Sequence, residues 1–389
     1  MSDSLMATYQ RLPVTFTRGE AAWLWDTEGR RYLDAISGIA VCGLGHAHPA
    51  IQQALCDQAG SLIHTSNLYG IQHQETLGDL LTRLSGMDRV FFSNSGAEAN
   101  EAAIKIARLH GHRKGIDNPT IIVMENSFHG RTLATLTATG NRKVQAGFEP
   151  LVKGFIRVPF GDFDAIADIS QSNSDVVAVL VEPVQGEGGV NIPPSDYLNS
   201  IRQICDQQEW LLMLDEIQTG MGRTGRMFAH QHNGILPDVM TLAKGLGNGV
   251  PIGACLAKGP AADVLGPGKH GSTFGGNPLV CRVGLSVLET LETDHLVERA
   301  ANLGERLLQG LRSSLRNTKG VNDIRGSGLM IGIELDRPCG ELVSQALQKG
   351  LLINVTTDSV IRLLPPLILT DEEADQIIGT VTTLVTDFL

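Results

Sequence analysis

The sequence predicts an α/β protein with a mostly parallel central sheet and a smaller α+β domain toward the C-terminus. Short continuous apolar runs near positions 90, 121, 176, 211 and 239 are typical of parallel strands that are buried on both faces. The 44 glycines cluster at the ends of apolar runs, where an α/β protein turns from strand to helix. Beyond about residue 280 the apolar period becomes helical and a strand-rich tail follows, which indicates a second domain.

The individual elements follow from the same periodicities. Near the N-terminus, residues 22–25 and 31–34 flank the turn 26–29 and predict a short hairpin. Helices are expected over 50–60, 75–84, 283–291 and 303–311, and strands over 329–335 and 361–366. We therefore expect three units: an N-terminal segment that packs with the small domain, a large domain and a small C-terminal domain, over residues 1–50, 51–280 and 281–389.

Length and composition exclude several classes of protein. A chain of 389 residues with 42% hydrophobic and 19% charged residues is globular rather than disordered. Its net charge of −11 disfavours nucleic acid and anionic membrane surfaces as partners. We find neither an apolar stretch of roughly 18 residues nor a signal peptide, so a soluble, cytoplasmic protein is expected. The six cysteines are far apart and form no CxxC, so no disulfide framework or zinc ribbon is expected.

The segment VFFSNSGAEANEAAIKIARLHG predicts a strand, a turn of small residues and a helix. Ser95, Gly96 and Ala97 leave the N-terminus of that helix free of bulky side chains, so its N–H groups and the positive end of its dipole can hold a phosphate. Ser95 and Glu98 also match the S-x-x-E capping box, which needs no ligand. This segment alone leaves both interpretations open.

A second apolar run, over residues 211–214, delivers Asp215 and Glu216 to the edge at which open α/β sheets bind ligands. A buried carboxylate there is costly unless it has a cationic partner. A bound metal or a helix cap would also explain the two acidic residues. The G-x-G-x-x-G over 220–225 is a weak dinucleotide motif, because its glycines follow the carboxylates and open no clear amphipathic helix.

A third run, PDVMTLA, ends at Lys244 and the glycine-rich turn GLGNG. A solvated surface lysine would not need glycines around it. A lysine that condenses with an aldehyde needs room for a planar ring and a lowered pKa. Taken alone, this segment does not decide between the two.

Together, the three strand ends match one cofactor better than any other. A helix N-terminus suits a phosphate, a carboxylate suits a pyridinium nitrogen and a lysine amine suits an aldehyde, and pyridoxal 5'-phosphate carries all three groups. Asp215 would keep the ring nitrogen protonated, so that the ring can accept the electrons of a substrate carbanion. Lys244 would hold the cofactor and then act as general base and acid.

Six motifs resemble a known family. In order, they are SNSGAEANEAAIKIAR, SFHGRT, VEPVQGEGG, LDEIQTGMGRTG, TLAKGLGNGVPIG and GSTFGGNP, as in class III, ornithine-type aminotransferases of fold type I. The resemblance extends from about residue 20 to the C-terminus. Within the family, ISGIAVCGLGHAHP, HTSNLY, RGSGLMIGIEL and VIRLLPPL are most similar to the members that act on acetylornithine.

The resemblance implies a role for each matching residue. Lys244 would be the Schiff-base lysine, Asp215 would pair with the pyridine nitrogen and Gln218 would hydrogen-bond the phenolic oxygen. The other implied cofactor contacts are Ser95, Gly96 and Ala97 at the phosphate, Phe128 on the ring, and Glu216 and Ile217 beside Asp215. Thr273, with Ser272, matches a segment that reaches the phosphate or substrate from the partner subunit, so a homodimer with shared active sites is expected.

Two arginines are candidates for binding substrate carboxylates, because a planar guanidinium holds a carboxylate by two hydrogen bonds. The resemblance assigns Arg131 to the carboxylate far from the reacting amine and Arg362 to the α-carboxylate of glutamate. Glu187 would neutralise Arg362 while acetylornithine, which has no charge beside its δ-carbon, is bound. Ornithine aminotransferases place a tyrosine at the position of Ile39, whose apolar side chain suits an acylated amine.

The resemblance therefore implies transfer of the δ-amino group of N2-acetyl-L-ornithine to 2-oxoglutarate, which gives N-acetyl-L-glutamate 5-semialdehyde and L-glutamate in arginine biosynthesis. Succinylornithine, succinyl-diaminopimelate and 4-aminobutyrate are alternative amine donors. A non-catalytic regulatory protein that binds pyridoxal phosphate is a further alternative, but it predicts loss of Lys244, Asp215 or Arg131, and all three are present. His46 and His48 lack a third ligand at a recognisable spacing, so no metal is expected.

Overall fold

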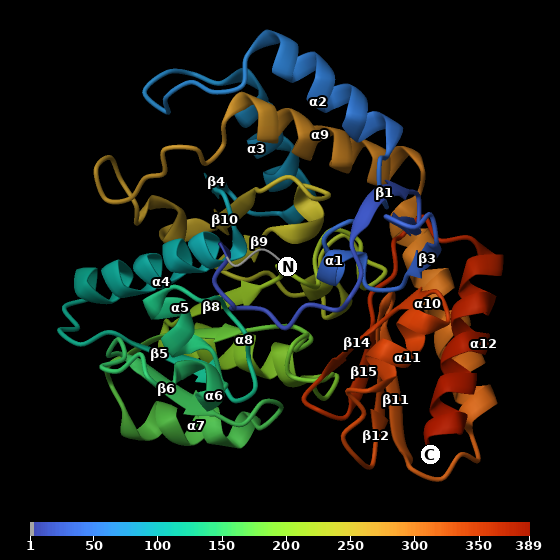
Figure 1. Cartoon of the computed structure of the whole chain (residues 1–389). Coiled ribbons are helices and arrows are strands. Elements are labelled where there is room, and N and C mark those ends of the chain that lie inside the picture. The colour runs from blue at the N-terminus through green and yellow to red at the C-terminus, as the bar shows by residue number, and fades with distance from the viewer. Residues whose placement is uncertain (1–3) are drawn as a thin grey trace.

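A seven-stranded sheet lies at the centre of the large domain in the computed structural model, which describes residues 4–389 (Figure 1). Its strand order is β4-β10-β9-β8-β7-β5-β6. The strands are β4 (Arg89–Ser93), β5 (Thr120–Met124), β6 (Phe155–Val158), β7 (Val176–Val181), β8 (Leu211–Asp215), β9 (Val239–Leu242) and β10 (Gly253–Ala257). β6, β5, β7, β8 and β9 pair in parallel, which confirms the predicted mostly parallel sheet.

The pairing of strand β4 differs from the prediction. This strand was expected to pair in parallel, but its only partner in the described sheet is β10, which runs antiparallel to both β4 and β9. Strand β10 was not predicted, because its sequence GACLA is short and made largely of small residues. β4 nevertheless points in the same direction as β9, since two antiparallel pairings separate them.

Both faces of the central sheet are covered, which explains the continuous apolar runs of its strands. Along β8, Leu211 and Met213 belong to the apolar cluster that includes α4 (Gly96–Arg113). Leu212 and Leu214 belong to the cluster on the other face, which includes α8 (Tyr197–Gln208), and α7 (Phe163–Ser172) contributes to the same cluster. A strand that is buried on both faces shows no polar alternation.

A second sheet joins the two ends of the chain, in the order β1-β2-β3-β13. It contains β1 (Phe16–Glu20), β2 (Trp23–Asp26), β3 (Arg31–Asp34) and β13 (Leu351–Leu352). The antiparallel β2–β3 pair confirms the predicted hairpin, and β13 pairs in parallel with β3. We propose the same three-part division of the chain as above, because this pairing couples the N-terminal segment to the C-terminal part.

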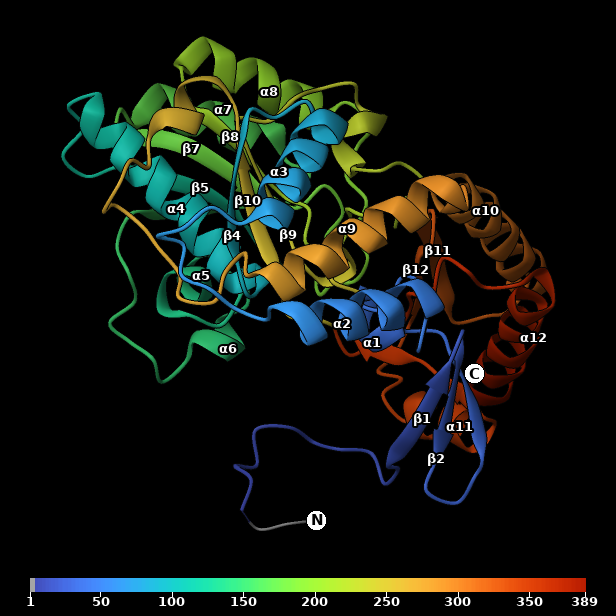
Figure 2. The ribbon, with the colours of Figure 1, turned by 90° about the horizontal axis from the view of Figure 1, so that it is seen from above.

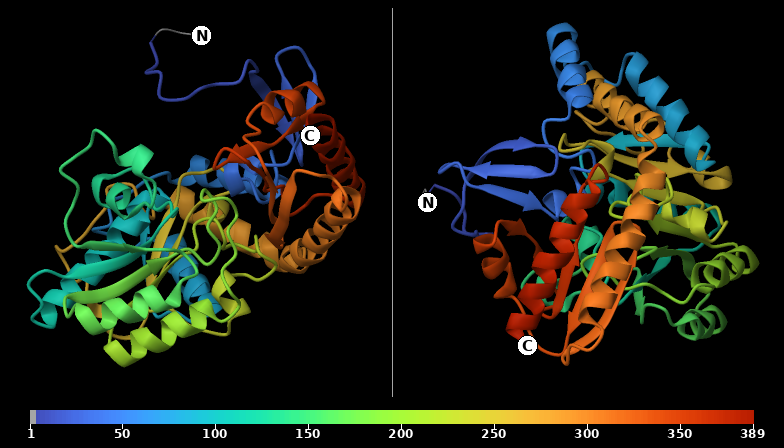
Figure 3. Two further views of the ribbon diagram at one scale, coloured as in Figure 1. Left: turned by 90° about the horizontal axis from the view of Figure 1, so that it is seen from below. Right: turned by 90° about the vertical axis from the view of Figure 1, so that its right-hand side faces the viewer.

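The C-terminal part contains a third sheet, in the order β11-β12-β15-β14. Its strands are β11 (Val321–Ser327), β12 (Met330–Leu335), β14 (Asn354–Thr356) and β15 (Val360–Leu363). The helices α10 (Leu296–Leu315) and α12 (Asp371–Phe388) run along this sheet (Figure 3, right). The predicted strands over 329–335 and 361–366 correspond to β12 and β15, although β15 ends before Pro365.

The remaining helices complete the layers. α2 (Pro49–Ser61) and α3 (Gln72–Ser85) both pack against α9 (Pro278–Thr293), and Figure 2 shows α2 and α9 side by side. With α10, they confirm the four predicted helices. The short elements are α1 (Ser37–Ala40), α5 (Leu133–Ala138), α6 (Arg142–Gln145), α11 (Leu342–Gln348) and the 3-10 turns η1 (Ala229–His232), η2 (Lys244–Leu246) and η3 (Gly259–Asp263). Among residues 4–389, we find no helix with the length and apolar character needed to span a membrane.

The turn after β3 has an unusual backbone. Ser37, Gly38, Ile39 and Ala40 have φ values of 46°, 62°, 69° and 60°, so four successive residues, three of them not glycine, occupy the left-handed region. Asp34 holds the start of this turn, because its Oδ1 accepts the N–H groups of Ile36 and Ser37 at 3.0 and 2.8 Å. The turn leads directly into the candidate site.

His46 has a structural partner beside this turn. Its Nε2 lies 2.8 Å from Oδ2 of the buried Asp34. Burial opposes charging of the imidazole, but the hydrogen bond to Asp34 outweighs it and raises the pKa of His46 to about 9. The ion pair therefore accounts for His46 without a metal.

Candidate active site

The carboxyl ends of five strands open into one cavity of about 400 Å³. β4, β5, β7, β8 and β9 point in the same direction, so the residues that follow them meet at one edge of the sheet. Ten predicted site residues line this cavity: Ser95, Gly96, Ala97, Phe128, Arg131, Glu187, Asp215, Ile217, Gln218 and Lys244. The cavity brings together segments that are far apart in the sequence.

The N-terminus of α4 forms one end of the cavity. Ser95 Oγ accepts the N–H of Glu98 at 3.2 Å, and the Glu98 carboxylate accepts the N–H of Asn94 at 2.5 Å. These caps leave the N–H groups of Gly96 and Ala97 without a partner in the described part of the chain. A Cβ on Gly96 would lie 2.6 Å from the side chain of Ile217, so glycine is needed there. Two free N–H groups at the positive end of a helix suit a phosphate.

Asp215 lies at the end of β8, is 4% exposed and lines the cavity. Its Oδ2 accepts a hydrogen bond from Asn100 Nδ2 and lies beside His129 Nδ1, both at 2.7 Å. Its Oδ1 accepts the N–H of Ile217 at 3.1 Å. The Thr241 hydroxyl donates to the Asn100 oxygen and so fixes the orientation of that amide. These contacts fix the orientation of the carboxyl group at the cavity wall, where it can accept a hydrogen bond from an N–H group in the cavity.

Lys244 follows β9 and begins η2. Its φ of 43° lies in the left-handed region, which costs roughly 1–3 kcal/mol outside glycine. Burial lowers the pKa of its amine; Glu187 opposes this shift and Arg362 adds to it. A lysine with a strained backbone and a lowered pKa, on the wall of a cavity, is suited to nucleophilic and proton-transfer chemistry.

Arg362 lies on β15 with its side chain fully buried. Its Nη1 donates to Glu187 at 2.7 Å and to Gln218 at 3.3 Å, and its Nε donates to Asn354 at 3.1 Å. Its Nη2 has no acceptor within the described residues. Burial raises the pKa of Glu187, but Arg362 outweighs this effect and holds that pKa below its ordinary value. The guanidinium thus has a spare donor beside a carboxylate that lines the cavity.

Phe128 and Arg131 lie on the more exposed wall of the cavity. Phe128 is half-buried and Arg131 is exposed. The Arg131 guanidinium stands over the Phe128 ring, 5.6 Å from its centroid, in a cation–π contact. This wall therefore offers an aromatic face and a positive charge next to each other.

Three predicted residues, Glu216, Ile39 and Arg362, do not line this cavity, although Arg362 is hydrogen-bonded to Glu187, which does. The Glu216 carboxylate accepts the N–H groups of Ala229 and His230, at 2.6 and 2.9 Å, and contacts the His230 ring at 2.9 Å. Ile39 is 36% exposed, and Val41, two residues later, lines the cavity instead. A sequence motif places these residues near the site, but it does not determine the direction of each side chain.

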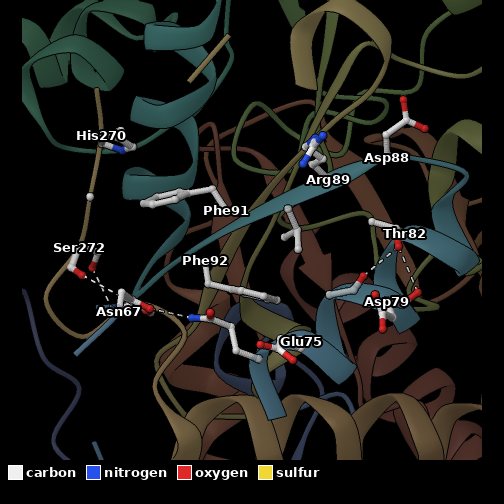
Figure 4. Close-up of a pocket in the computed structure, with 15 residues that line it drawn as sticks. Asn67, Glu75, Asp79, Thr82, Asp88, Arg89, Phe91, Phe92, His270 and Ser272 are labelled. Atoms are coloured by element: carbon white, nitrogen blue, oxygen red, sulfur yellow. Dashed lines mark hydrogen bonds between the residues drawn. The ribbon is translucent and has the colours of Figure 1, made fainter. Parts of the chain in front are cut away.

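Ser272 and Thr273 also lie outside this cavity, in a loop beside the edge strand β4. Ser272 lines a second cavity of about 660 Å³, where its carbonyl oxygen accepts a hydrogen bond from Asn67 at 3.1 Å (Figure 4). Its hydroxyl accepts hydrogen bonds from Asn94 Nδ2 at 3.2 Å and from the N–H of Gly275 at 2.9 Å. Thr273 is exposed. Within one subunit, the loop reaches Asn94 at the rim of the first cavity but does not enter it.

Three buried polar residues at the site were missed by sequence analysis: Asn100, His129 and Glu182. Asn100 and His129 hold Asp215, and Glu182 lines the cavity. Glu182 had the same signal as Asp215, an acidic residue directly after a buried apolar strand. Nothing in the spacing of Asn100 or His129 predicts their contact with Asp215, because that contact joins three separate segments.

Comparison with known proteins gives consistent matches over the whole chain. The family model Aminotransferase class-III matches residues 5–385. A protein of Nitrosomonas europaea named acetylornithine aminotransferase is 60% identical over 385 residues, 99% of this chain and 98% of that protein. An ornithine aminotransferase from Toxoplasma gondii, described with partial occupancy of PLP at its active site, has a TM-score of 0.95 at 35% identity and covers 99% of this chain and 92% of its own. An acetylornithine aminotransferase from Elizabethkingia anophelis has a TM-score of 0.88 at 35% identity, with 98% and 96% of the two chains covered.

Proposed function

The chain belongs to the class-III aminotransferases, which use pyridoxal 5'-phosphate, and on that premise we propose that it is an acetylornithine aminotransferase. It transfers the δ-amino group of N2-acetyl-L-ornithine to 2-oxoglutarate and releases N-acetyl-L-glutamate 5-semialdehyde and L-glutamate. The observation that carries the proposal is the single cavity shared by Lys244, Asp215 and Glu187, with Arg362 hydrogen-bonded to Glu187 at its wall. The relative with 60% identity over the full chain supports the choice of amine donor.

The residues of the cavity fit the cofactor group by group. The free N–H groups of Gly96 and Ala97, with the Ser95 turn, would hold the phosphate. Asp215 would hold a proton on the ring nitrogen, Gln218 would contact the phenolic oxygen and Phe128 would stack on the ring. When bound, pyridoxal phosphate supplies an aldehyde that combines with primary amines and a protonated ring that accepts an electron pair.

Lys244 is the group that moves protons. Because desolvation lowers its pKa, a larger fraction of its amine is neutral near pH 7 than in an exposed lysine. With pyridoxal phosphate bound, a neutral Nζ would hold its aldehyde and, once the amine donor is there, would take the proton from the δ-carbon of acetylornithine and pass it to the carbon that carried the aldehyde. In the second half-reaction the same Nζ would carry a proton the opposite way, to the α-carbon that becomes that of glutamate.

Arg131 and Arg362 bind the substrate carboxylates in this proposal. Arg131, on the exposed wall, would take the carboxylate that lies far from the reacting carbon in either substrate. Arg362 would bind the α-carboxylate of glutamate, for which its unpartnered Nη2 and its Nη1 offer two donors. Acetylornithine has no charge next to its δ-carbon, so Glu187 would stay on Arg362 during that half-reaction.

Replacing Glu187 with alanine should therefore affect the two half-reactions unequally. The variant leaves the buried Arg362 uncompensated when acetylornithine is bound, whereas glutamate supplies its own carboxylate. We expect kcat/KM for acetylornithine to fall by about tenfold or more and that for glutamate by less than about threefold. Single-turnover absorption changes with each amine donor measure this ratio.

Glu125 provides the control for that experiment, because it is an exposed glutamate near the same edge of the sheet. Glu125→Ala should leave both half-reactions at wild-type rates. Equal losses in the two half-reactions of Glu187→Ala would contradict the exchange of Glu187 for a substrate carboxylate.

A panel of amine donors tests the substrate. Purified holoenzyme should show the highest single-turnover kcat/KM with N-acetylornithine, compared with succinylornithine, succinyl-diaminopimelate, ornithine and 4-aminobutyrate. A preference for 4-aminobutyrate or for a succinylated donor would overturn the proposed substrate. No turnover with any donor would favour the non-catalytic alternative. The cavity argues against that alternative, because it contains Lys244, Asp215 and Arg131 together.

We further propose that the enzyme is a homodimer that completes its sites across the interface. Thr273 lies outside the cavity of its own subunit, in an exposed loop, as a residue that serves a partner would. Leu68, Tyr69 and Phe274 near this loop are 87%, 68% and 60% exposed, and such apolar exposure is typical of an interface. Asn67 ties the two segments together through hydrogen bonds to the carbonyl oxygens of Ser272 and Gly275, both at 3.1 Å.

A further inference from the structure

Glu182 is a buried carboxylate of the cavity that the proposed mechanism does not use. It follows β7 directly, at the same edge of the sheet as Asp215, and is 5% exposed. Its side chain makes no ion pair with a lysine or arginine within residues 4–389. A buried acidic group without a cationic partner is unfavourable for folding, so its presence on the cavity wall calls for a role.

The two oxygens of Glu182 hold two different segments. Oε2 accepts the N–H of Phe128 at 3.1 Å, and Oε1 accepts the N–H of Gly186 at 3.3 Å. Phe128 belongs to the segment after β5 and Gly186 to the turn after β7. One carboxyl group thus joins two strand ends that pack side by side.

Each of these segments carries a residue that faces the cofactor or the substrate in the proposed function. Phe128 offers its ring to the cavity and supports Arg131 through the cation–π contact. Gly186 directly precedes Glu187, the partner of Arg362. A shift of the Glu182 side chain would therefore displace both segments, and with them Phe128 and Glu187.

Gly186 also packs against Gln218 with no free space between them. A Cβ on Gly186 would lie only 2.1 Å from Gln218 Oε1. The position of the Gly186 backbone therefore restricts where the Gln218 amide can lie, and the amide restricts the backbone in turn. The same Gln218 oxygen accepts a hydrogen bond from Arg362 at 3.3 Å. The carboxylate of Glu182 is thus connected through Gly186 to Gln218, and through Gln218 to Arg362.

The charges around Glu182 distinguish it from a carboxylate that only accepts backbone N–H groups in a local turn. Burial raises the pKa of Glu182, with His129 opposing the shift and Asp215 adding to it. Asp26, by comparison, is a buried carboxylate that accepts the N–H groups of Glu28 and Arg30, both at 2.9 Å, but it also has the Arg30 guanidinium at 2.8 Å. Asp26 stabilises a local turn, whereas Glu182 connects distant segments without such compensation.

We propose that Glu182 is a positioning residue of the active site. It holds Phe128 and the turn that carries Glu187 in fixed positions relative to each other around the cofactor. This inference rests on the proposed function. In this proposal Glu182 acts through the backbone N–H groups of Phe128 and Gly186 and not on the reacting atoms. Loss of its carboxylate should change the orientation of the bound ring and the binding of both substrates together, while the chemistry at Lys244 remains available.

The test compares Glu182→Gln, Glu182→Ala and the control Asp26→Asn as holoenzymes. The readouts are the visible circular dichroism of bound pyridoxal phosphate, the cofactor dissociation constant, and KM and kcat for both half-reactions. Glu182→Ala should alter the dichroism and weaken cofactor binding by about tenfold, because two hydrogen bonds are lost. Glu182→Gln should lie between it and the wild type, since its amide oxygen can accept only one of the two N–H groups in the native geometry.

Asp26→Asn should lower the thermal midpoint and leave the visible dichroism unchanged, because Asp26 lies in the N-terminal hairpin. Visible dichroism and KM values of Glu182→Ala that match those of the wild type would overturn the proposal. If Glu182→Ala does not fold, the result for Glu182→Gln decides: wild-type dichroism and cofactor affinity would also overturn it. The dichroism does not depend on the amine donor, so a preference for 4-aminobutyrate would contradict the proposed substrate and leave this test intact.

Discussion

Lys244→Ala should lose turnover by at least about ten-thousand-fold, because it removes both the amine that anchors the cofactor and the base that moves the substrate proton. Alanine adopts the left-handed backbone of this position with a similar strain, and it removes a buried amine that is costly to desolvate. Without the cofactor, the thermal midpoint of the variant should therefore stay at or above that of the cofactor-free wild type. Single-turnover kinetics of the holoenzyme and thermal unfolding of the cofactor-free protein measure the two effects.

Lys258→Ala is the matched control for that variant. Lys258 directly follows β10, at the end of the strand opposite to the cavity, where its amine lies 3.5 Å from Asp88. It should retain wild-type turnover. A Lys244→Ala enzyme that turned over within a few-fold of the wild type would remove the basis of the proposed mechanism.

Asp215→Ala should lower turnover by about a thousand-fold, with a smaller loss of cofactor affinity. The carboxylate is the buried negative charge that would keep the ring nitrogen protonated, and charge stabilisation of this kind is among the largest contributions to catalysis. The change also removes the partner of His129 Nδ1 and one of the two acceptors of Asn100 Nδ2, which keeps the His129 carbonyl oxygen at 2.8 Å, and this loss should lower the thermal midpoint. Stopped-flow absorption and thermal unfolding measure the two effects.

Asp215→Asn separates the charge from the shape of the side chain. The amide oxygen can still accept one donor, but it cannot hold a proton on the ring nitrogen by charge, so the turnover should fall nearly as far as in Asp215→Ala. Asp238→Asn is the control, because Asp238 directly precedes the neighbouring strand β9 and accepts the N–H of Leu212 at 2.7 Å, at the end of the strands opposite to the cavity. If Asp215→Ala retained turnover within a few-fold, Asp215 would not be the partner of the ring nitrogen.

The strand ends could be predicted because apolar runs and the residues that follow them are local properties of the chain. Runs at 90, 121, 176, 211 and 239 correspond to β4, β5, β7, β8 and β9. Strands β6 and β10 were not predicted, since FIRV and GACLA are short and contain a charged or several small residues. The antiparallel insertion of β10 between β4 and β9 therefore needed the structure.

The direction in which a side chain points was harder to predict from the sequence than the strand end that carries it. Asp215 and Glu216 are adjacent and equally acidic, yet Asp215 lines the cavity while Glu216 binds the backbone of η1. Glu182 has the same sequence signal as Asp215 but was overlooked, because its partners Phe128 and Gly186 can be recognised only from hydrogen bonds. Val41 takes the place on the cavity wall that Ile39 was expected to hold.

The sequence by itself determined the α/β architecture and the polar residues delivered by each strand end, because parallel strands bring their carboxyl ends to a common edge. Only the tertiary structure decided which of those side chains meet. Asn100 and Asp215 are 115 residues apart, and their hydrogen bond depends on how α4 packs against β8. Such a contact is set by the orientation of two separate elements, and no local spacing in the chain encodes that orientation.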